Sequence, residues 1–232
     1  MNVILAVPSR YTMQNETVGT LIDLALALAR KGAQVGYHFT SSPYIDQNRH
    51  LNFQYALRHG ADYLFFVDND IYLLSNPDEA VHALFSLDKD IAVGIYHLRI
   101  KPHYPLIFDI IEPGKPCFEF RDIPAVPTRV DAAATGFMLI KRKVMEAFTD
   151  EYMCENGMPF AQMQLEQEGK VSMLGEDLSF CWRAHVLGFE IWADPSIHLS
   201  HIDRQFIHRA TWEGAKGVYP VKLSGGIHDR GR

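Results

Sequence analysis

The first 70 residues alternate between short apolar runs, rich in β-branched and aromatic residues, and longer segments with helical spacing. Residues 2–10 (NVILAVPSR) have the composition of a strand, and residues 17–33 place apolar side chains on one helix face before Gly32 ends the pattern. The same alternation continues with a strand over 34–40, a helix over 46–60 and a strand over 62–68. Strands alternating with helices favour a parallel sheet covered by helices, so this pattern predicts an α/β fold.

The rest of the chain extends the pattern less regularly. We expect a helix over 76–88, a strand over 90–99, short hairpins or loops over 101–130, and a strand then a helix over 129–148. A surface excursion over 151–171 and a helix from Glu176 to near Gly188 should follow. The chain should end with a last strand over 189–194 and a loosely ordered tail from Arg204.

Length and composition limit the class of protein. With 232 residues, of which 47% are hydrophobic, the chain can bury one full core, so one domain is the default. The formal net charge of −6 gives no overall basic field for a nucleic-acid backbone. No window approaches the roughly 18 apolar residues of a membrane span, so any membrane association would be peripheral.

Cysteine usage indicates the compartment. Cys117, Cys154 and Cys181 are far apart and have no CxxC spacing, and the N-terminus has no charged region followed by a long apolar run. We therefore expect a cytoplasmic protein with reduced thiols.

Two carboxylates follow the apolar run that ends at Val67. Asp68 and Asp70 flank Asn69 at the carboxyl end of a predicted parallel strand, where α/β proteins bind their ligands. An oxygen-rich pair of this kind suits Mg²⁺ or Mn²⁺ together with substrate phosphates. The alternative is an Asx turn that initiates the next segment.

A second group of polar residues lies near the C-terminus. Glu176 and Asp177 open a predicted helix, where the helix dipole alone favours acidic residues, so capping is the alternative to a catalytic role. His198 and His201 follow the last predicted strand, and a neutral imidazole there can supply a nitrogen ligand or serve a structural role.

Five segments follow one another along the chain: the N-terminal βαβ unit, ADYLFFVDND, ATGFMLIKR, GEDLSFCWRAHVLGFEIWADP and HLSH. In this order they resemble the nucleotide-sugar-dependent glycosyltransferases of the GT-A fold, closest to the family 2 type. The resemblance covers residues 2–203. It implies a GT-A domain over 1–203, with a mostly parallel central sheet and a small antiparallel element, and a tail over 204–232 that is either a lid over the donor or solvated surface.

The resemblance also implies roles for the acidic and histidine residues. Asp70 would bind a divalent metal directly, Asp68 would contact the ribose or the metal, and His201 would complete the metal site, with His198 as the second choice. Asp177 would be the general base of an inverting transferase. Glu176 would be its neighbour in the acceptor pocket.

Further positions match donor-binding segments of the family. Pro8, Ser9, Arg10 and Arg49 lie where such enzymes hold the nucleotide base and ribose, and Asn69 belongs to the DxD motif. The family often has Arg-Asn where this chain has Asn48-Arg49, which leaves the role of Arg49 open.

Other strand-end residues are also candidates for the crevice. Gly136 would let a sugar approach the backbone, or else marks a strand bulge. Tyr96, His97 and Arg99 end a strand on the crevice side and are further candidates for donor or acceptor contact.

The resemblance thus predicts transfer of a sugar from a UDP-, GDP- or dTDP-sugar to an acceptor hydroxyl with Mn²⁺ or Mg²⁺, by inversion or by retention. The acceptor could be a glycan, a lipid-linked sugar, a protein or a small molecule. The only basic residues that favour a nucleic-acid acceptor are Lys141–Lys143 and the arginines of the tail. A sugar nucleotidyltransferase is one alternative, although AVPSRYTMQNE lacks the glycines of its phosphate loop. A non-catalytic saccharide-binding domain is another.

Overall fold

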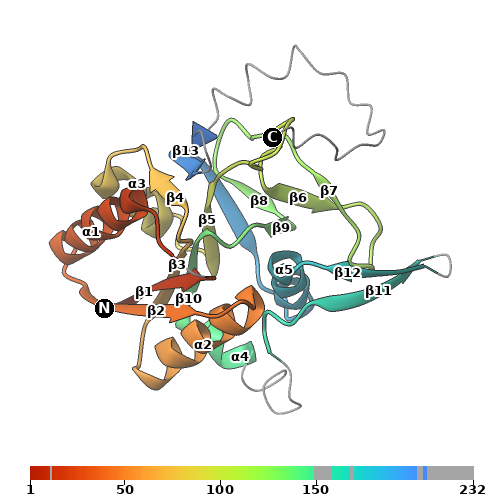
Figure 1. The fold of residues 1–232 in the computed structure, drawn as a ribbon, viewed down its shortest axis with the longest axis horizontal. Coiled ribbons are helices and arrows are strands. Elements are labelled where there is room, and N and C mark those ends of the chain that lie inside the picture. Colours follow the sequence, from red (N-terminus) through yellow and green to blue (C-terminus); the bar gives the residue numbers. More distant parts are fainter. Residues whose placement is uncertain (11, 149–157, 168–169, 203–205, 208–232) are drawn as a thin grey trace, which may run out of the picture.

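The computed structural model describes residues 1–10, 12–148, 158–167, 170–202 and 206–207. Its centre is a twisted sheet (Figure 1). The strands lie in the order β14 (Phe206–Ile207), β13 (Ile191–Ile202), β5 (Ile91–Ile95), β10 (Phe137–Lys141), β3 (Tyr63–Val67), β1 (Asn2–Ser9) and β2 (Gln34–Ser41), with β4 (Ile71–Leu73) and β8 (Thr128–Val130) also paired to β13.

The main sheet is mostly parallel. β1 runs parallel to β2 and to β3, and β13 runs parallel to β5, whereas β10 is antiparallel to both of its neighbours. This arrangement confirms the predicted fold class and is consistent with a GT-A-like domain. It brings the carboxyl ends of β1, β3 and β5 to one edge of the sheet.

Helices cover both faces of the sheet. Helices α1 (Asn15–Arg30) and α3 (Pro77–Ser86) pack on one face, and α2 (Ile45–Arg58), α4 (Arg142–Phe148) and α5 (Glu176–Val186) pack on the other (Figure 1). Side chains of β1 alternate between these two cores: Val3 and Leu5 face α1 and α3, while Ile4 and Ala6 face α2 and α4. The sheet therefore separates two apolar cores, and the apolar faces of the helices pack into one core or the other.

Smaller antiparallel elements complete the fold. β6 (Ile107–Ile110) pairs with β7 (Phe118–Phe120) and β9 (Ala132–Ala133), within and just after the segment expected to form short hairpins or loops. β11 (Met163–Gln167) and β12 (Lys170–Leu174) form a hairpin that the sequence analysis did not predict as strands. The apolar residues Val171 and Met173 are about 60% exposed in this hairpin, whereas Leu174 is buried.

The last strand is longer than predicted. β13 continues to Ile202 instead of ending at Asp194, and its register with β5 shifts between Asp194 and His198. Pro195 lies within this shift, where a missing N–H is tolerated. Beyond it, β4 becomes the partner of β13, so pairing continues as far as His201. Only Phe206 and Ile207 of the predicted lid, 204–232, lie among the described residues. None of the helices in the described part is long and apolar enough to cross a membrane.

A stack of three phenylalanines anchors α5 to the sheet. The Phe180 ring stacks on Phe160 at 4.5 Å and on Phe148 at 5.0 Å between centroids, and all three side chains are fully buried. Since α5 begins with Glu176 and Asp177, this stack also fixes the direction from which two acidic side chains enter the crevice.

Phe180→Ala should lower the free energy of unfolding by about 3–5 kcal/mol, because it removes a fully buried ring and leaves a cavity. Urea unfolding followed by tryptophan fluorescence measures the loss. Phe39→Ala is the control, since Phe39 is 54% exposed on the edge strand β2, and it should change the stability by less than about 1 kcal/mol. Equal losses for the two variants would contradict this description of the core.

Candidate active site

A cavity of about 690 Å³ opens at the carboxyl ends of β1, β3 and β5, beside the N-terminus of α5. Its wall combines four acidic side chains, three arginines, one histidine and several apolar side chains. The lining residues include Arg10, Arg49, Asp68, Asn69, Asp70, Tyr96, Arg99, Glu176, Asp177 and His201. Polar groups from distant parts of the sequence therefore converge on one concave site, as in ligand pockets.

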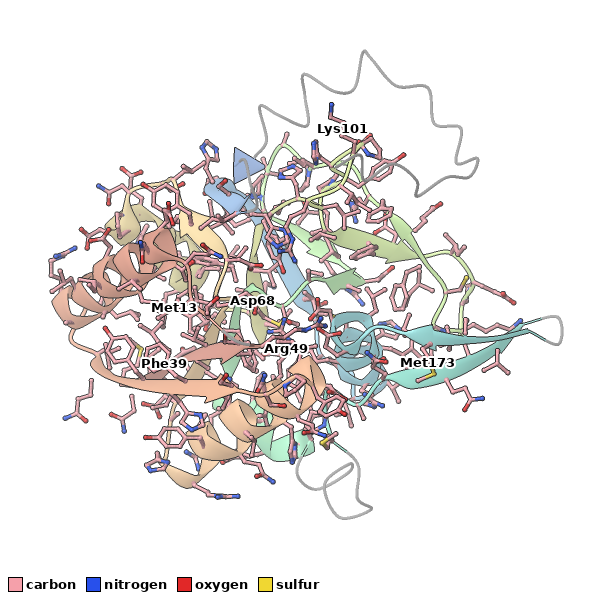
Figure 2. All side chains as sticks on the ribbon, viewed as in Figure 1. Met13, Phe39, Arg49, Asp68, Lys101 and Met173 are labelled. Atoms are coloured by element: carbon pink, nitrogen blue, oxygen red, sulfur yellow. The ribbon has the colours of Figure 1, made fainter. Side chains whose placement is uncertain are left out.

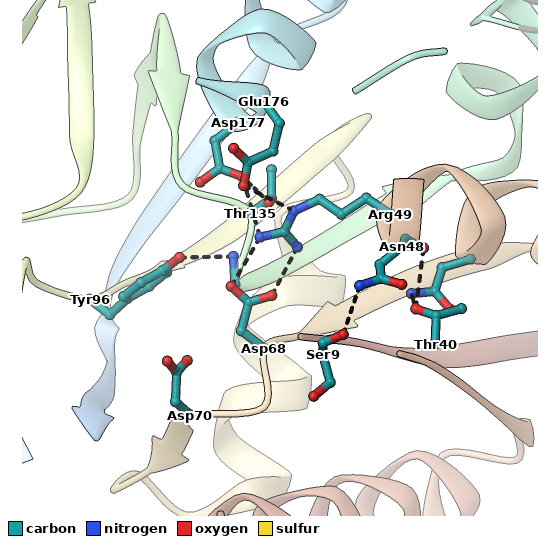
Figure 3. Close-up of polar contacts among 12 residues, drawn as sticks. Ser9, Thr40, Asn48, Arg49, Asp68, Asp70, Tyr96, Thr135, Glu176 and Asp177 are labelled. Atoms are coloured by element: carbon teal, nitrogen blue, oxygen red, sulfur yellow. Dashed lines mark hydrogen bonds and ion pairs between the residues drawn. The ribbon is translucent and has the colours of Figure 1, made fainter. Parts of the chain in front are cut away.

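One buried arginine lies among three carboxylates. Arg49, on α2, is only 2% exposed, and its guanidinium donates two hydrogen bonds to Asp68, at 2.8 and 3.0 Å. The same guanidinium lies 3.4 Å from Oδ1 of Asp177 and 3.8 Å from Oε1 of Glu176. Figure 2 places Arg49 and Asp68 near the centre of the molecule, and Figure 3 shows the guanidinium between Asp68 and the acidic pair of α5.

The charges of this cluster perturb one another. Burial alone would lower the pKa of Arg49, but the adjacent charges of Asp68, Asp177 and Glu176 outweigh it and raise that pKa above its usual range. The guanidinium therefore stays charged. A planar fork of donors is suited to hold carboxylates in this way.

Asp177 has the most perturbed carboxyl group of the cluster. Burial raises its pKa to about 7; Arg49 opposes the shift, whereas the negative charges of Glu176 and Asp68 add to it. Thr135 donates a hydrogen bond to Oδ1, the oxygen that also faces Arg49. These contacts orient the carboxylate from one side. A carboxyl group with a pKa near neutrality can exchange protons with a substrate.

The segment Asp68–Asp70 forms a turn held by its neighbours. The N–H of Asp68 donates to the carbonyl of Gly136 at 2.9 Å, and the N–H of Ile71 donates back to the carbonyl of Asp68 at 3.2 Å. The N–H of Ile202 donates to the carbonyl of Asp70 at 2.7 Å. The backbone thus turns after β3, and the Asp68 side chain reaches Arg49 instead of capping its own turn.

Asp70 lies apart from the Arg49 cluster (Figure 3). Its Oδ2 is 3.1 Å from Nη1 of Arg99 and 3.5 Å from Nε2 of His201. Burial alone would raise the pKa of Asp70, but contact with His201 and the charges of Arg99 and Arg49 lower it below its usual range. This carboxylate is therefore ionised at neutral pH.

The tautomer of His201 is set by its other nitrogen. Nδ1 lies 2.8 Å from the carbonyl of His97, and because a carbonyl only accepts, Nδ1 carries the proton. In the imidazolium, the Nε2–H group faces Asp70 as a donor; in the neutral ring, the Nε2 lone pair is the ligand that a cation beside Asp70 could use. Metal-binding histidines are oriented by the same kind of contact. His198, in contrast, is exposed and does not line the cavity.

The donor set of Asp70 and His201 fits a Mg²⁺ or Mn²⁺ ion that takes its other ligands from phosphate and water. Among the described residues, no group of three or more His, Cys, Asp or Glu side chains is placed to hold a metal. Both oxygens of Asp68 are paired with Arg49. A metal bound by Asp68 as well would have to share that carboxylate with the guanidinium.

Gly136 is needed for close packing beside Asp68. A Cβ atom at this position would lie 2.5 Å from the Tyr96 hydroxyl and 2.8 Å from Oδ2 of Asp68. The N–H of Gly136 donates to the Tyr96 hydroxyl at 3.0 Å, and the Tyr96 ring meets His201 edge-on at 5.2 Å. Tyr96 thus contacts both the Asp68 side and the His201 side of the site.

The segment after β1 lies next to the DxD turn. Asn69 donates to the hydroxyl of Ser9 at 3.2 Å and to the carbonyl of Thr12. Buried Asn48 donates to the carbonyl of Ser9 at 2.7 Å. Arg10 lines the cavity, whereas Pro8 is buried within β1.

The predicted site residues therefore fall into two sets. The cavity wall includes Arg10, Arg49, Asp68, Asn69, Asp70, Glu176, Asp177 and His201, whereas Pro8, Ser9 and Gly136 do not line it. Neither Thr135 nor Asn48 had a role predicted from the sequence. Thr135 lies next to Gly136 and Asn48 lies next to Arg49, and both Gly136 and Arg49 were candidates. No sequence pattern at Thr135 or Asn48 itself predicted a role for either residue.

Comparisons with known proteins identify a shared fold. A scan against protein-family models gives no match, and a search of curated proteins gives none either. Among solved structures, A197 from STIV superposes with a TM-score of 0.57 and 18% sequence identity over 98% of this chain and 100% of its own. The chain therefore shares the α/β fold of A197 along almost its whole length.

A second solved structure aligns less well. It is a glycosyltransferase involved in the glycosylation of the major capsid of PBCV-1, with a TM-score of 0.36 and 13% identity over 65% of this chain and 67% of its own. Such a TM-score supports no inference about the fold or the activity of this chain, so its function has to be argued from the site.

Arg49→Met should lower the free energy of unfolding by about 3–5 kcal/mol, because it leaves three carboxylates together without their buried counter-ion. Arg30→Met is the control: Arg30 also pairs with a carboxylate through two hydrogen bonds, but on the surface, where solvent screens the pair, so its loss should be far smaller. Urea unfolding at pH 8 measures both. Similar losses would show that the buried cluster does not depend on Arg49.

Asp177→Asn should raise the midpoint of thermal unfolding at pH 8, with a smaller gain toward pH 4. The folded protein raises the pKa of Asp177 from 3.8 to about 7, so its contribution to stability is full below pH 3.8 and is lost as the pH rises through 7. Asparagine still accepts the hydrogen bond from Thr135 and has no charge to bury.

Differential scanning fluorimetry between pH 4 and 8 tests this linkage. Asp78→Asn, at an exposed ion pair with Arg30, should show no comparable gain at high pH. A midpoint for Asp177→Asn that is below wild type at every pH would rule out the raised pKa as the source.

Proposed function

We propose that this chain is a metal-dependent glycosyltransferase that moves a sugar from a nucleoside diphosphate sugar to an acceptor hydroxyl with inversion. One observation carries the proposal: a single cavity contains both a carboxyl group with a pKa near 7, Asp177, and a separate carboxylate–imidazole pair, Asp70 and His201. The first suits proton transfer and the second suits a divalent cation. The resemblance of the sequence to GT-A glycosyltransferases supports the same assignment.

Asp70 and His201 are the residues proposed to hold the metal. A Mg²⁺ or Mn²⁺ ion at this position supplies a Lewis acid that neutralises charge on a departing diphosphate. Asn69 and Arg10 line the cavity beside this point and are proposed to face the nucleotide of a UDP-, GDP- or dTDP-sugar, with Ser9 hydrogen-bonded to Asn69 behind them.

Asp177 is proposed as the general base. Its described contacts both go to Oδ1, so Oδ2 is the oxygen assigned to receive the proton of the acceptor hydroxyl. The acceptor oxygen then forms the new bond to the anomeric carbon, and the bond from that carbon to the diphosphate breaks with release of the nucleoside diphosphate. Proton transfer by a positioned base accelerates such a step by about 10²–10⁴-fold.

Arg49 has a supporting role in this proposal. It is buried and stays charged, and it keeps Asp68, Glu176 and Asp177 in one arrangement. Its attraction also limits the rise in the pKa of Asp177, which a base active at neutral pH requires.

Asp177→Asn should lower the rate of metal-dependent hydrolysis of the preferred nucleotide sugar by about 10²–10⁴-fold, because water in the acceptor position loses its base. Donor affinity should change less than threefold, since Asp177 is not assigned to the donor. Wild-type kcat/KM should rise with pH around an apparent pKa near 7. Nucleotide release from UDP-, GDP- and dTDP-sugars with Mn²⁺, Mg²⁺ or EDTA measures these quantities.

Two further variants complete this experiment. Asp70→Asn should lose metal-dependent binding of the donor, and Asp78→Asn, far from the cavity, should behave as wild type. Binding of a saccharide without nucleotide release from any donor would instead favour a saccharide-binding domain. Formation of a nucleotide sugar from a sugar phosphate and a nucleoside triphosphate would favour a nucleotidyltransferase. Near-normal turnover by Asp177→Asn would remove that residue from the role of base.

A further inference from the structure

Arg99 makes the least expected contact in the cavity. Its Nη1 lies 3.1 Å from Oδ2 of Asp70, the same oxygen that faces Nε2 of His201 at 3.5 Å. Two nitrogen groups, one from strand β13 and one from the loop after β5, thus converge on one carboxylate oxygen. This oxygen belongs to the pair of side chains that fits a divalent cation, so Arg99 lies where its positive charge competes with that cation.

The Arg99 side chain is about half exposed, although its backbone is held. Arg99 is 47% exposed, whereas its partner Asp70 is only 16% exposed. The loop that carries Arg99 is closed by a hydrogen bond from the N–H of Leu98 to the carbonyl of Tyr104 at 2.9 Å, and by another from the N–H of Leu106 to the carbonyl of Tyr96 at 2.8 Å. A change of partner by Arg99 therefore needs only side-chain rotation.

The charges in the cavity make such a change favourable. Of the three lining arginines, Arg49 is buried and paired with carboxylates, so it is not available to a ligand. Four carboxylates surround the same space. A nucleoside diphosphate adds further negative charge, and a guanidinium fork binds phosphate oxygens through two parallel hydrogen bonds.

We propose that Arg99 is a diphosphate-binding residue that pairs with Asp70 until a divalent cation occupies that carboxylate, and then turns to the phosphates of the nucleotide. The inference rests on the proposed function, because it needs both the cation and the nucleoside diphosphate. It gives Arg99 two opposite effects: it opposes binding of the cation alone and favours binding of the nucleotide.

The two effects can be measured separately from turnover. Binding of Mn²⁺ alone is titrated by electron paramagnetic resonance of the free ion, and binding of UDP, GDP and dTDP at saturating Mn²⁺ is titrated by calorimetry. The proteins are the wild type, Arg99→Gln, Arg99→Lys and the control Arg129→Gln. Arg129 is similarly exposed, at 50%, and pairs with Glu190 at 3.4 Å outside the cavity.

Arg99→Gln should bind Mn²⁺ alone about two- to fivefold more tightly than wild type, the size expected from removing an exposed competing ion pair. It should bind the preferred nucleoside diphosphate about tenfold more weakly, the size of a lost charge-assisted hydrogen bond. Arg99→Lys keeps the charge and loses the fork, so both of its constants should lie between those of wild type and Arg99→Gln. Arg129→Gln should match wild type in both.

If Arg99 exchanges between Asp70 and the phosphates, Arg99→Gln should change the affinities for Mn²⁺ and for the nucleoside diphosphate in opposite directions. A variant that is merely misfolded weakens both ligands, and weaker binding of both by Arg99→Gln would overturn the proposal, as would two unchanged constants. A wild-type protein that binds neither Mn²⁺ nor any of the three nucleotides would instead overturn the proposed function itself. The two failures are therefore distinguishable.

Discussion

The site depends on one buried cation surrounded by three carboxylates. Arg49 comes from α2, Asp68 from the end of β3, and Glu176 and Asp177 from the first turn of α5. Without the guanidinium, these negative charges would repel one another in a partly buried space. Arg49 therefore fixes how the α5 end of the cavity meets the sheet. The stack of Phe148, Phe160 and Phe180 holds the same helix from the apolar side.

The two aspartates of the DxD motif consequently have different surroundings. Asp68 is tied to Arg49 by two hydrogen bonds, whereas Asp70 faces His201 and Arg99 across the cavity. The turn between them separates the two side chains, and the hydrogen bond from Ile202 to the carbonyl of Asp70 joins this turn to β13. One carboxylate thus belongs to a fixed ion pair, and the other remains open to exchange between cations.

Much of this arrangement could be predicted from local sequence patterns. The alternation of strands and helices predicted the fold class, and the position of Asp68 and Asp70 after an apolar run placed them at the crevice. The pairing of Arg49 with Asp177 was not predictable, because residues 128 positions apart meet only through the placement of α2 and α5 on the same face of the sheet. The choice of His201 over His198 depended on the register of β13 after its bulge, which no local pattern specifies. The β11–β12 hairpin was missed because two of its apolar residues, Val171 and Met173, remain exposed and the segment has no clear periodicity.

The position of the metal in a crystal of the protein grown with Mn²⁺ and the nucleoside diphosphate that it prefers would show whether Asp70 and His201 hold it. Anomalous scattering locates Mn²⁺ independently of the surrounding model. One strong peak is expected between Oδ2 of Asp70 and Nε2 of His201, with Asp68 still bound to Arg49. A peak at any other carboxylate, or an Asp68 side chain released from Arg49 to bind the metal, would contradict this assignment.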